Sequence, residues 1–408
     1  MLDWLKPFSI FCYLDNQQYN IAPHQSECIV AAGSQEIIEG ADIKEMERLL
    51  EKKQWVFGHL SYELNASVYG LSSSKKDRIG FPLFHFFVPQ IVLEIKNDEL
   101  TIHASSPNDV FNSIDTRQVI DATTTINNIQ FHSILSKAGY IQKVTALQQH
   151  ILRGDCYEIN FCQEFFAEDT TLNPFEVFKN LMQVSPNPFS AFYRLNDKFL
   201  ICASPERFLT KRGNKIISQP IKGTIKRELS SQQKDEKLKE ELLYSPKEQS
   251  ENVMIVDLVR NDLARICKEE SVKVDELFGI YSFPQLHQMI STISGELKDD
   301  VSFSDIIDAT FPMGSMTGAP KHRVMQLIDE YEPSARGIFS GSVGYFNPQG
   351  DFDFNVVIRS IMYNASSQYL SYQVGSAITF YSDAEKEWEE CMLKAEAIKK
   401  VLTFQPAP

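Results

Sequence analysis

The chain has 408 residues, a hydrophobic content of 43% and a formal net charge of −14 at pH 7, so it can bury the core of one large domain or two ordinary ones. The acidic balance argues against nucleic-acid binding, because a phosphate backbone requires clustered lysine and arginine. No apolar run reaches the roughly eighteen residues of a membrane helix, and residues 1–20 do not resemble a signal peptide, so we expect a cytoplasmic protein. The seven cysteines form no Cys-x-x-Cys pair, which argues against a zinc site and a disulfide framework.

The N-terminal third has the pattern of a mixed α and β region. Residues 1–103 contain short apolar and aromatic runs between turn residues, with one helix expected near residues 43–53. Residues 104–128 are rich in Ser, Thr, Asn and Asp, which is typical of a loop or linker. We therefore predict an N-terminal region at residues 1–128 and a second domain, which carries the motifs described below, at residues 129–408.

The second domain alternates groups of strands with helices. The spacing of Tyr140, Val144, Leu147 and Ile151 predicts a helix, and residues 231–267 form a charged, helix-rich segment. Short turns between successive strands predict antiparallel neighbours, so we expect an α+β fold, a layered sandwich of largely antiparallel sheets flanked by helices. The expected strands are residues 189–195, 199–203, 208–211, 216–219, 340–346, 352–362 and 368–374.

A lysine lies between a proline and a glycine in the stretch Gln219-Pro220-Ile221-Lys222-Gly223-Thr224. Proline fixes its own φ angle and glycine permits conformations that other residues resist, so together they can hold Lys222 in a rigid, unusual turn. Such a lysine can take part in chemistry. These six residues alone favour the simpler interpretation, a surface lysine at a strand end.

The last helix carries charged residues beside its apolar stripe. We expect it to begin at a capping box formed by Ser382 and Glu385. Glu387, Glu390 and Lys394 follow at spacings of three and four residues, so they share one face of the helix. An exposed ion pair, worth about 0.3–0.5 kcal/mol, is the simple explanation of that spacing.

A second Glu-x-x-Glu pair consists of Glu248 and Glu251, which lie one turn apart if residues 247–265 form a helix. If the two glutamate pairs face each other, they create a site of oxygen ligands with room for water, which suits magnesium rather than zinc. Carboxylates gathered so closely would repel each other without a cation. A divalent metal is the simplest explanation if they converge.

Two small-residue segments and one arginine are candidates for binding a carboxylate. Residues 314–321, Gly-Ser-Met-Thr-Gly-Ala-Pro-Lys, lack the spacing of a phosphate loop but offer backbone amides and the Thr317 hydroxyl. Residues 374–377 can do the same. Arg359 lies in a largely apolar run, where it either forms an internal ion pair or clamps a substrate carboxylate through two hydrogen bonds.

Taken together, these stretches resemble the chorismate-utilising enzymes, which include anthranilate synthase component I, aminodeoxychorismate synthase component I and the isochorismate and salicylate synthases. The resemblance covers about residues 135 to 402 in the right order, with a looser match at residues 58–63 (Gly-His-Leu-Ser-Tyr-Glu), and it implies the fold of that family. The matching stretches are Ser204-Pro205-Glu206-Arg207-Phe208 and residues 220–224, 251–262, 314–321, 341–345, 359–360, 375–377 and 387–394.

Within this family, the position of Lys222 separates the two aminating branches. Anthranilate synthases carry alanine there, whereas aminodeoxychorismate synthases carry lysine. The resemblance implies that the lysine amine attacks carbon 2 of chorismate, so that ammonia enters at carbon 4, expels the lysine and gives 4-amino-4-deoxychorismate. The amine must be neutral to react, so we expect Lys222 to have a depressed pKa.

The resemblance assigns roles to further residues. Glu206 is implied as a general acid or base, and His287 is implied to assist loss of the hydroxyl group, although a lone histidine is more often structural. The implied substrate-binding residues are Thr224, Thr317, Gly318, Tyr345, Arg359, Gly375, Ser376 and Lys394.

The resemblance also implies a cofactor and a partner. Glu251 and Glu390 are implied as ligands of Mg²⁺, with Glu248 and Glu387 acting directly or through water, and the metal would hold the ring carboxylate of the substrate. No residue suggests a glutaminase, so ammonia is expected from a separate glutamine amidotransferase subunit.

Two departures from the family pattern bear on the function. Glu158 stands where the aminating members usually have glutamine and the water-adding members have lysine, which disfavours the water-adding branch and leaves the role of Glu158 open. The Leu-Leu-Glu-Ser signature of tryptophan-inhibited anthranilate synthases is missing, so feedback by tryptophan is not expected. Two alternatives stay open: anthranilate synthase component I, and a chorismate-binding protein without turnover.

Overall fold

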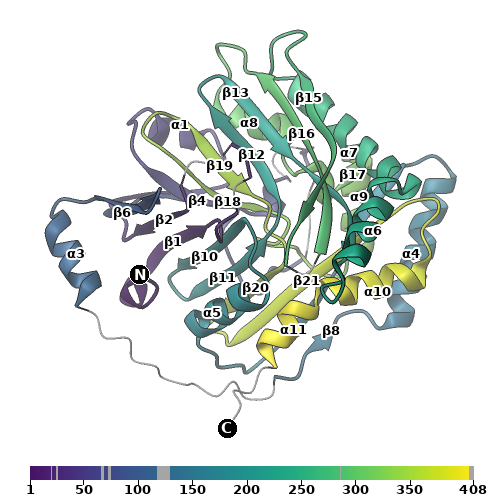
Figure 1. Ribbon diagram of the computed structural model, residues 1–408, viewed down its shortest axis with the longest axis horizontal. Helices are drawn as coiled ribbons and strands as arrows, with labels where there is room; N and C mark the ends of the chain where they lie inside the picture. Colours follow the sequence, from purple (N-terminus) through teal and green to yellow (C-terminus); the bar gives the residue numbers. More distant parts are fainter. Residues whose placement is uncertain are drawn as a thin grey trace.

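The computed structural model describes residues 1–19, 21–23, 26–65, 69–71, 75–116, 129–284 and 286–403. These residues form two large antiparallel sheets with helices packed around them (Figure 1). The first sheet, in spatial order, contains β17 (Gly318–Ala319), β9 (Glu158–Ala167), β21 (Tyr369–Ile378), β20 (Ser360–Asn364), β11 (Lys198–Ser204), β10 (Phe189–Leu195), β1 (Ile10–Asp15), β2 (Cys28–Ala32), β6 (Ile91–Lys96) and β7 (Glu99–His103), with β8 (His132–Ser133) paired to β9.

The second sheet also combines strands from distant parts of the sequence. In spatial order it contains β14 (Ile221–Lys226), β16 (Leu286–Glu296), β13 (Lys215–Gln219), β12 (Arg207–Arg212), β19 (Phe352–Asn355), β18 (Ser342–Phe346), β4 (Val56–Leu60), β5 (Phe84–Val88) and β3 (Glu36–Gly40), with β15 (Lys273–Ser282) paired to β16.

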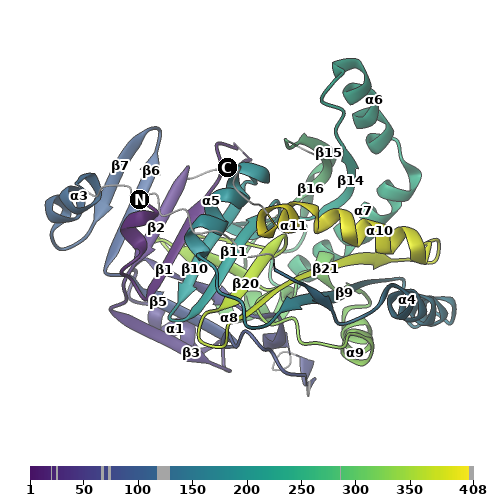
Figure 2. The same ribbon diagram turned by 90° about the horizontal axis from the view of Figure 1, so that it is seen from below.

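The helices lie mainly outside the two sheets. Figures 1 and 2 both place α4, α6, α7 and α10 at one end of the molecule and α3 at the other. The helical segments are η1 (Asp3–Leu5), α1 (Glu45–Leu50), η2 (Tyr62–Leu64), α3 (Pro107–Asp115), α4 (Lys137–Leu152), α5 (Pro174–Val184), α6 (Gln232–Leu243), α7 (Pro246–Ala264), α8 (Phe303–Thr310), η3 (Gly314–Met316), α9 (Lys321–Tyr331), α10 (Ala384–Lys394) and α11 (Glu396–Leu402).

Two hydrophobic cores lie on the two faces of the first sheet. In β10, Ala191 and Tyr193 face the core between the sheets, whereas Phe192 faces a second core formed with α4, α5, α9, α10 and α11. This alternation follows from the period of two along a strand. Because both faces are buried, the strands read as continuous apolar runs in the sequence, and the predicted α+β class is confirmed.

The predicted single series of antiparallel neighbours is wrong at one point. Strands β10 and β11 pair, and β12 and β13 pair, but β11 and β12 lie in different sheets. The chain crosses between the sheets at Pro205 and Glu206, where the proline lacks the N–H of a ladder bond. The run predicted at residues 352–362 crosses in the same way, because β19 lies in the second sheet and β20 in the first.

The N-terminal strands are built into both sheets. Strand β1 pairs with β10, and β4 pairs with β18, so hydrogen-bonded ladders join residues from both sides of the predicted division at residue 128. Residues 117–128, the end of the predicted linker, lie outside the described residues. The division itself stays a prediction.

The predicted capping box at the last helix is wrong. Asp383, not Ser382, caps α10 and accepts hydrogen bonds from the backbone N–H groups of Glu385 and Lys386. The Ser382 hydroxyl instead accepts the backbone N–H of Thr379 at 3.0 Å. The helical stretch is also divided at Ala395 into α10 and α11.

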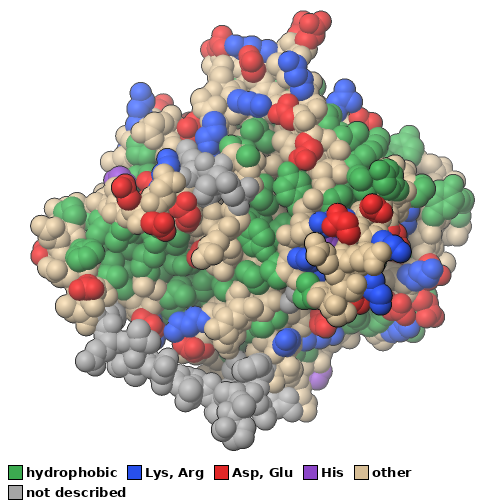
Figure 3. Space-filling model, viewed as in Figure 1, with side chains coloured by type: hydrophobic (Ala, Val, Ile, Leu, Met, Phe, Trp, Pro, Cys, Tyr) green, Lys and Arg blue, Asp and Glu red, His purple; other side chains and the backbone are tan. Residues whose placement is uncertain are grey.

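The cysteines and the charged side chains of the surface can be compared with what the composition indicates. All seven cysteines are buried and free. On the face shown in Figure 3, acidic and basic side chains intermingle around hydrophobic ones. Among the described residues, none of the helices is long and apolar enough to cross a membrane.

Replacing Phe192 by alanine tests the second core. Phe192 is fully buried and contacts the rings of Phe11, Phe175 and Phe178, so Phe192→Ala should lower the free energy of unfolding by about 3–5 kcal/mol through lost burial and the cavity left behind. The midpoint of denaturant unfolding measures this. Phe111→Ala is the control, because Phe111 is 50% exposed on α3; equal shifts for both variants would contradict this packing.

Candidate active site

A cavity of about 230 Å³ lies where β14 and α7 approach β21 and α10. Its wall includes both glutamate pairs, the lysine of the proline–glycine stretch and the two places where the chain crosses between the sheets. The predicted site residues that line the cavity are Lys222, Glu206, Thr224, Arg359, Gly375, Lys394, Glu248, Glu251, Glu387 and Glu390.

Lys222 is held in place by an irregularity of β14. Ile221 pairs with Ile290 and Thr224 pairs with Gln288, so two residues, Lys222 and Gly223, lie opposite one residue of β16. Such a bulge re-aims a side chain, and Gly223 adopts a φ of 94° that favours glycine. Lys222 is only 8% exposed, so it is not a surface lysine.

The Lys222 ammonium group forms a buried ion pair across the two sheets. Its Nζ lies 2.5 Å from Oε1 of Glu158 on β9. Burial by itself lowers the pKa of Lys222, but the carboxylates of Glu158, Glu251 and Glu206 outweigh it, and the pKa is raised. The predicted depressed pKa is therefore wrong, because the cavity surrounds the lysine with negative charge.

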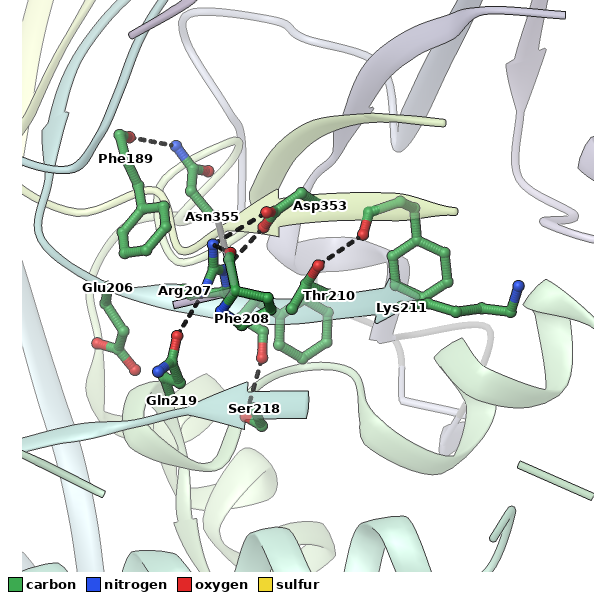
Figure 4. A network of polar contacts seen from close by, with 12 residues as sticks. Phe189, Glu206, Arg207, Phe208, Thr210, Lys211, Ser218, Gln219, Asp353 and Asn355 are labelled. Atoms are coloured by element: carbon green, nitrogen blue, oxygen red, sulfur yellow. Dashed lines mark hydrogen bonds and ion pairs between the residues drawn. The ribbon is translucent and has the colours of Figure 1, made fainter. Parts of the chain in front are cut away.

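Glu206 lies at the first crossover between the sheets. Its Oε1 accepts a hydrogen bond from the Ser315 hydroxyl at 2.6 Å. Burial raises the pKa of Glu206 to about 7, while the Ser315 hydrogen bond and the charge of Lys222 oppose the rise. Figure 4 shows that the neighbouring Arg207 belongs to a separate network with Asp353 and Gln219. Glu206 can thus both give and take a proton near neutral pH.

Arg359 lies at the second crossover. It adopts a φ of 53°, unusual for a residue other than glycine, and its carbonyl oxygen accepts the N–H of Ala203 at 3.2 Å. Within the part of the chain that the structure describes, its guanidinium makes no hydrogen bond or ion pair. Of the two interpretations of this arginine, the geometry favours a group that binds a ligand carboxylate over an internal ion pair.

The two glutamate pairs share the cavity wall. Burial raises the pKa of Glu248 and Glu387, and it raises that of Glu251 to about 7. Lys394 forms an ion pair with Glu390 at 2.7 Å and lowers its pKa. The i,i+4 pair considered from the sequence is therefore present, but it forms at the cavity.

The oxygen donors of the site suit a magnesium ion that is held by only a few side chains. Oε1 of Glu251 is buried without a hydrogen-bond partner, and the acidic ligands offer only oxygen, which Mg²⁺ prefers. In the described ranges, no group of three or more His, Cys, Asp or Glu side chains is close enough together to hold a metal. One or two carboxylates together with water and substrate are a common magnesium environment, so the arrangement suits an ion held by one or two of these glutamates better than a four-carboxylate cage.

His287 does not reach the cavity. Leu286 and Gln288 on β16 line it, and the side chain between them points to the opposite face, as alternation along a strand requires. There the imidazole of His287 contacts Asp235 and Ser282, each at 2.9 Å. The geometry gives no support to its predicted role in loss of the hydroxyl group.

Four predicted substrate-binding residues also lie outside the cavity wall. The Thr317 hydroxyl donates to the Met313 carbonyl, and Gly318 lies so close to β9 that an added Cβ would be 2.1 Å from a carbonyl oxygen. Tyr345 packs against Phe57 and lines a different cavity. The Ser376 hydroxyl bonds to a tyrosine of α4. These residues shape strands around the site but do not touch its interior.

Several polar residues that line or support the site carry no clear signal in the sequence. Ser315 was part of the small-residue loop, but nothing in the sequence links its hydroxyl to Glu206. Gln288 lines the cavity and its Oε1 is buried without a partner. Asn160 donates to the Ser315 carbonyl at 2.9 Å. Glu158 departs from a family pattern, but the sequence assigns it no contact with Lys222.

Comparison with known proteins agrees with the fold and the site. The chorismate binding enzyme family matches residues 6–400. Aminodeoxychorismate synthase component 1 of Escherichia coli is 33% identical over 372 residues, 90% of this chain and 81% of that protein. The protein of the same name from Bacillus subtilis is 36% identical over 272 residues, 67% of this chain and 57% of that protein.

A solved structure shares the architecture. The crystal structure of anthranilate synthase component I from Streptococcus pneumoniae aligns with a TM-score of 0.82 and 25% identity, covering 95% of this chain and 94% of that one. This likeness confirms the fold that the resemblance implied. With a family match that spans nearly its whole length, the chain belongs to the chorismate binding enzymes.

Proposed function

We propose that this protein aminates chorismate at carbon 4 to give 4-amino-4-deoxychorismate, the route to p-aminobenzoate in folate biosynthesis. The observation that carries the proposal is the position of Lys222, which is buried in the wall of the cavity that Glu206 and Glu251 also line, and which pairs with Glu158 behind it. Relatives named aminodeoxychorismate synthase component 1 support the same assignment.

The cavity residues have different proposed roles toward a dicarboxylate substrate. Arg359 and Lys394 offer positive charge to its carboxylates, and the carbonyl of Gly375 holds the Lys394 ammonium at 3.0 Å. The Lys222 amine attacks carbon 2, the ring double bonds shift, and the hydroxyl on carbon 4 leaves as water with a proton from Glu206. Ammonia then attacks carbon 4, the double bonds shift back, and Lys222 leaves.

A metal and a partner complete the proposal. Glu251 and Glu390 would hold Mg²⁺, with Glu248 and Glu387 acting through water, and the ion would supply positive charge for the ring carboxylate. Ammonia would come from a glutamine amidotransferase subunit, as the words "component 1" in the names of the relatives suggest.

Anthranilate synthase component I remains the second candidate, because a solved structure of that name shares the fold. Attack of ammonia itself on carbon 2 leads toward anthranilate. The Lys222 amine is already positioned in the cavity to attack carbon 2 in place of ammonia, which favours amination at carbon 4.

The product of the purified protein tests the assignment. With chorismate, ammonium and Mg²⁺, the wild type should form 4-amino-4-deoxychorismate, identified by chromatography with mass spectrometry. Lys222→Ala should lower this rate to below roughly one hundredth, because loss of a covalent nucleophile is costly, whereas Lys215→Ala on the exposed end of β13 should not. Anthranilate and pyruvate from the wild type, without added lyase, would refute the assignment; an unchanged rate in Lys222→Ala would refute the covalent route.

The pH profile tests the role of Glu206. Because Glu206 must be protonated to donate and burial raises its pKa to about 7, kcat/KM for chorismate should fall as the pH rises through about 7. The Ser315 hydrogen bond favours the charged carboxylate, so Ser315→Ala should move this fall to higher pH. Ser342→Ala, which removes a buried hydroxyl bonded to the Asn355 carbonyl, should leave it in place. A shift to lower pH would contradict the assignment.

Removing a proposed metal ligand tests the magnesium site. Glu251→Gln should raise the Mg²⁺ concentration for half-maximal activity by at least roughly tenfold, the loss typical even of an outer-shell partner. Calorimetric titration with Mg²⁺ measures the binding directly. The control is Asp257→Asn, since Asp257 lies on the same helix and pairs with Arg260 at the surface. Equal Mg²⁺ affinity in Glu251→Gln and the wild type would remove Glu251 from the site.

A further inference from the structure

The proposed chemistry leaves one proton unassigned. Lys222 rests as an ammonium ion among carboxylates, and an ammonium ion has no lone pair with which to attack carbon 2. A negatively charged substrate would favour the ammonium further. A base must therefore accept a proton from Nζ before or during the attack.

The position of Glu158 is fixed by backbone contacts on both sides. Its strand pairs with β17, so that Tyr157 N–H donates to the Ala319 carbonyl and Asn160 N–H donates to the Thr317 carbonyl. The close approach of Gly318 to the Glu158 carbonyl allows this pairing. Glu158 therefore presents its carboxylate to Lys222 from a rigid strand, not from a loop.

The carboxylate of Glu158 is suited to accept a proton. It is 1% exposed, Oε1 contacts Lys222 Nζ, and Oε2 is buried without a hydrogen-bond partner. Two buried charges are costly to keep out of water. Transfer of one proton turns this ion pair into a neutral amine and a neutral acid, so the loss of the attraction between the charges is offset by removal of the desolvation cost.

The other carboxylates around Lys222 are less suited to this step. Among the described residues, Glu158 is the only one that accepts a hydrogen bond from Lys222 Nζ, at 2.5 Å. Glu206 is bonded to Ser315 and is needed as the acid for the departing hydroxyl. The charged groups that face Lys222 or its carboxylates are Glu158 on β9, Glu206 at the crossover, Lys247, Glu248 and Glu251 on α7, and Glu390 and Lys394 on α10.

We propose that Glu158 is the catalytic base that takes the proton from Lys222 and returns it at the end of the cycle; this inference rests on the proposed function. In the first half, Glu158 gains a proton from the ammonium, the nitrogen bonds to carbon 2, and the carbon 4 hydroxyl leaves as water with the proton of Glu206. The Lys222 nitrogen, now bonded to carbon 2, carries the positive charge.

The second half restores every group. Ammonia bonds to carbon 4, and the bond between carbon 2 and the Lys222 nitrogen breaks to release the neutral amine. Glu158 returns its proton to this amine, and the new amino group on carbon 4 gives one proton to Glu206. No oxidant or further reactant is needed.

Formation of the lysine adduct without ammonia isolates the first half. Wild-type protein is mixed with chorismate and Mg²⁺, quenched over time and measured by intact-protein mass spectrometry. In Glu158→Gln the rate at pH 7 should fall on the order of a hundredfold, the usual contribution of a general base. Both proteins need protonated Glu206 for loss of the hydroxyl, so the rate of the variant relative to that of the wild type should rise with pH, as more of Lys222 loses its proton without Glu158. In steady state, kcat should fall while KM for chorismate stays close to the wild-type value.

Two variants make the result specific. Glu164→Gln is the matched control, because Glu164 is buried on the same strand and accepts from the Tyr369 hydroxyl at 2.9 Å; its adduct rate should equal that of the wild type. Glu158→Asp keeps a carboxylate on a shorter side chain, so it should retain the pH dependence of the wild type at a lower rate, and it provides the test if the glutamine variant does not fold.

Each outcome separates the inference from the proposed function. An unchanged rate in Glu158→Gln, or a deficit relative to the wild type that does not shrink as the pH rises, would overturn the role of Glu158, since the carboxylate would then only hold the lysine as an ammonium ion. A Glu158→Asp variant that behaves like the glutamine variant would do the same. If the wild type forms no adduct at Lys222, the covalent route of the proposed function fails, and the inference fails with it.

Discussion

The buried ion pair between Lys222 and Glu158 is the interaction on which the site depends. It joins β14 of one sheet to β9 of the other, so the reactive amine can lie in the cavity only if the two sheets pack in this register. The same pair sets the chemical problem. The carboxylates that make burial of a lysine tolerable also keep it protonated, and a reaction through its lone pair must move that proton within the cavity.

Three of the residues that line the cavity lie where regular structure is interrupted. Lys222 lies on a bulge, and Glu206 and Arg359 lie at the two places where the chain passes from one sheet to the other. The crossovers are tied together, because Val356 N–H donates to the Glu206 carbonyl and Ala203 N–H donates to the Arg359 carbonyl. Regular ladders would turn these side chains into one of the apolar cores.

A second buried ion pair, between Arg336 and Glu332, supports β9. The Arg336 guanidinium bonds to Glu332 and donates to the carbonyls of Met316 and Asn160, while Glu332 accepts the N–H of Cys162. Breaking such a satisfied, buried network is costly. The network fixes the strand that carries Glu158 and the segment that carries Ser315, whose hydroxyl bonds to Glu206. The same network therefore supports both the proposed base, Glu158, and the proposed acid, Glu206.

The sequence by itself determined many of the helices and strands, the α+β class, the family, and the two glutamate pairs and two lysines (Lys222 and Lys394) that line the cavity, because periodic apolar runs and short motifs are local properties. It did not determine the strands β9, β15 and β16. It did not determine that Glu206 and Arg359 lie at sheet crossovers, that His287 and Tyr345 point elsewhere, or that Glu158 contacts Lys222. Strand alternation turns neighbouring residues to opposite faces, and the pairing of β9 with β17 and of β14 with β16 decides which face meets the cavity. The raised pKa of Lys222 follows from the same cause, because charges from distant segments gather only in the tertiary structure.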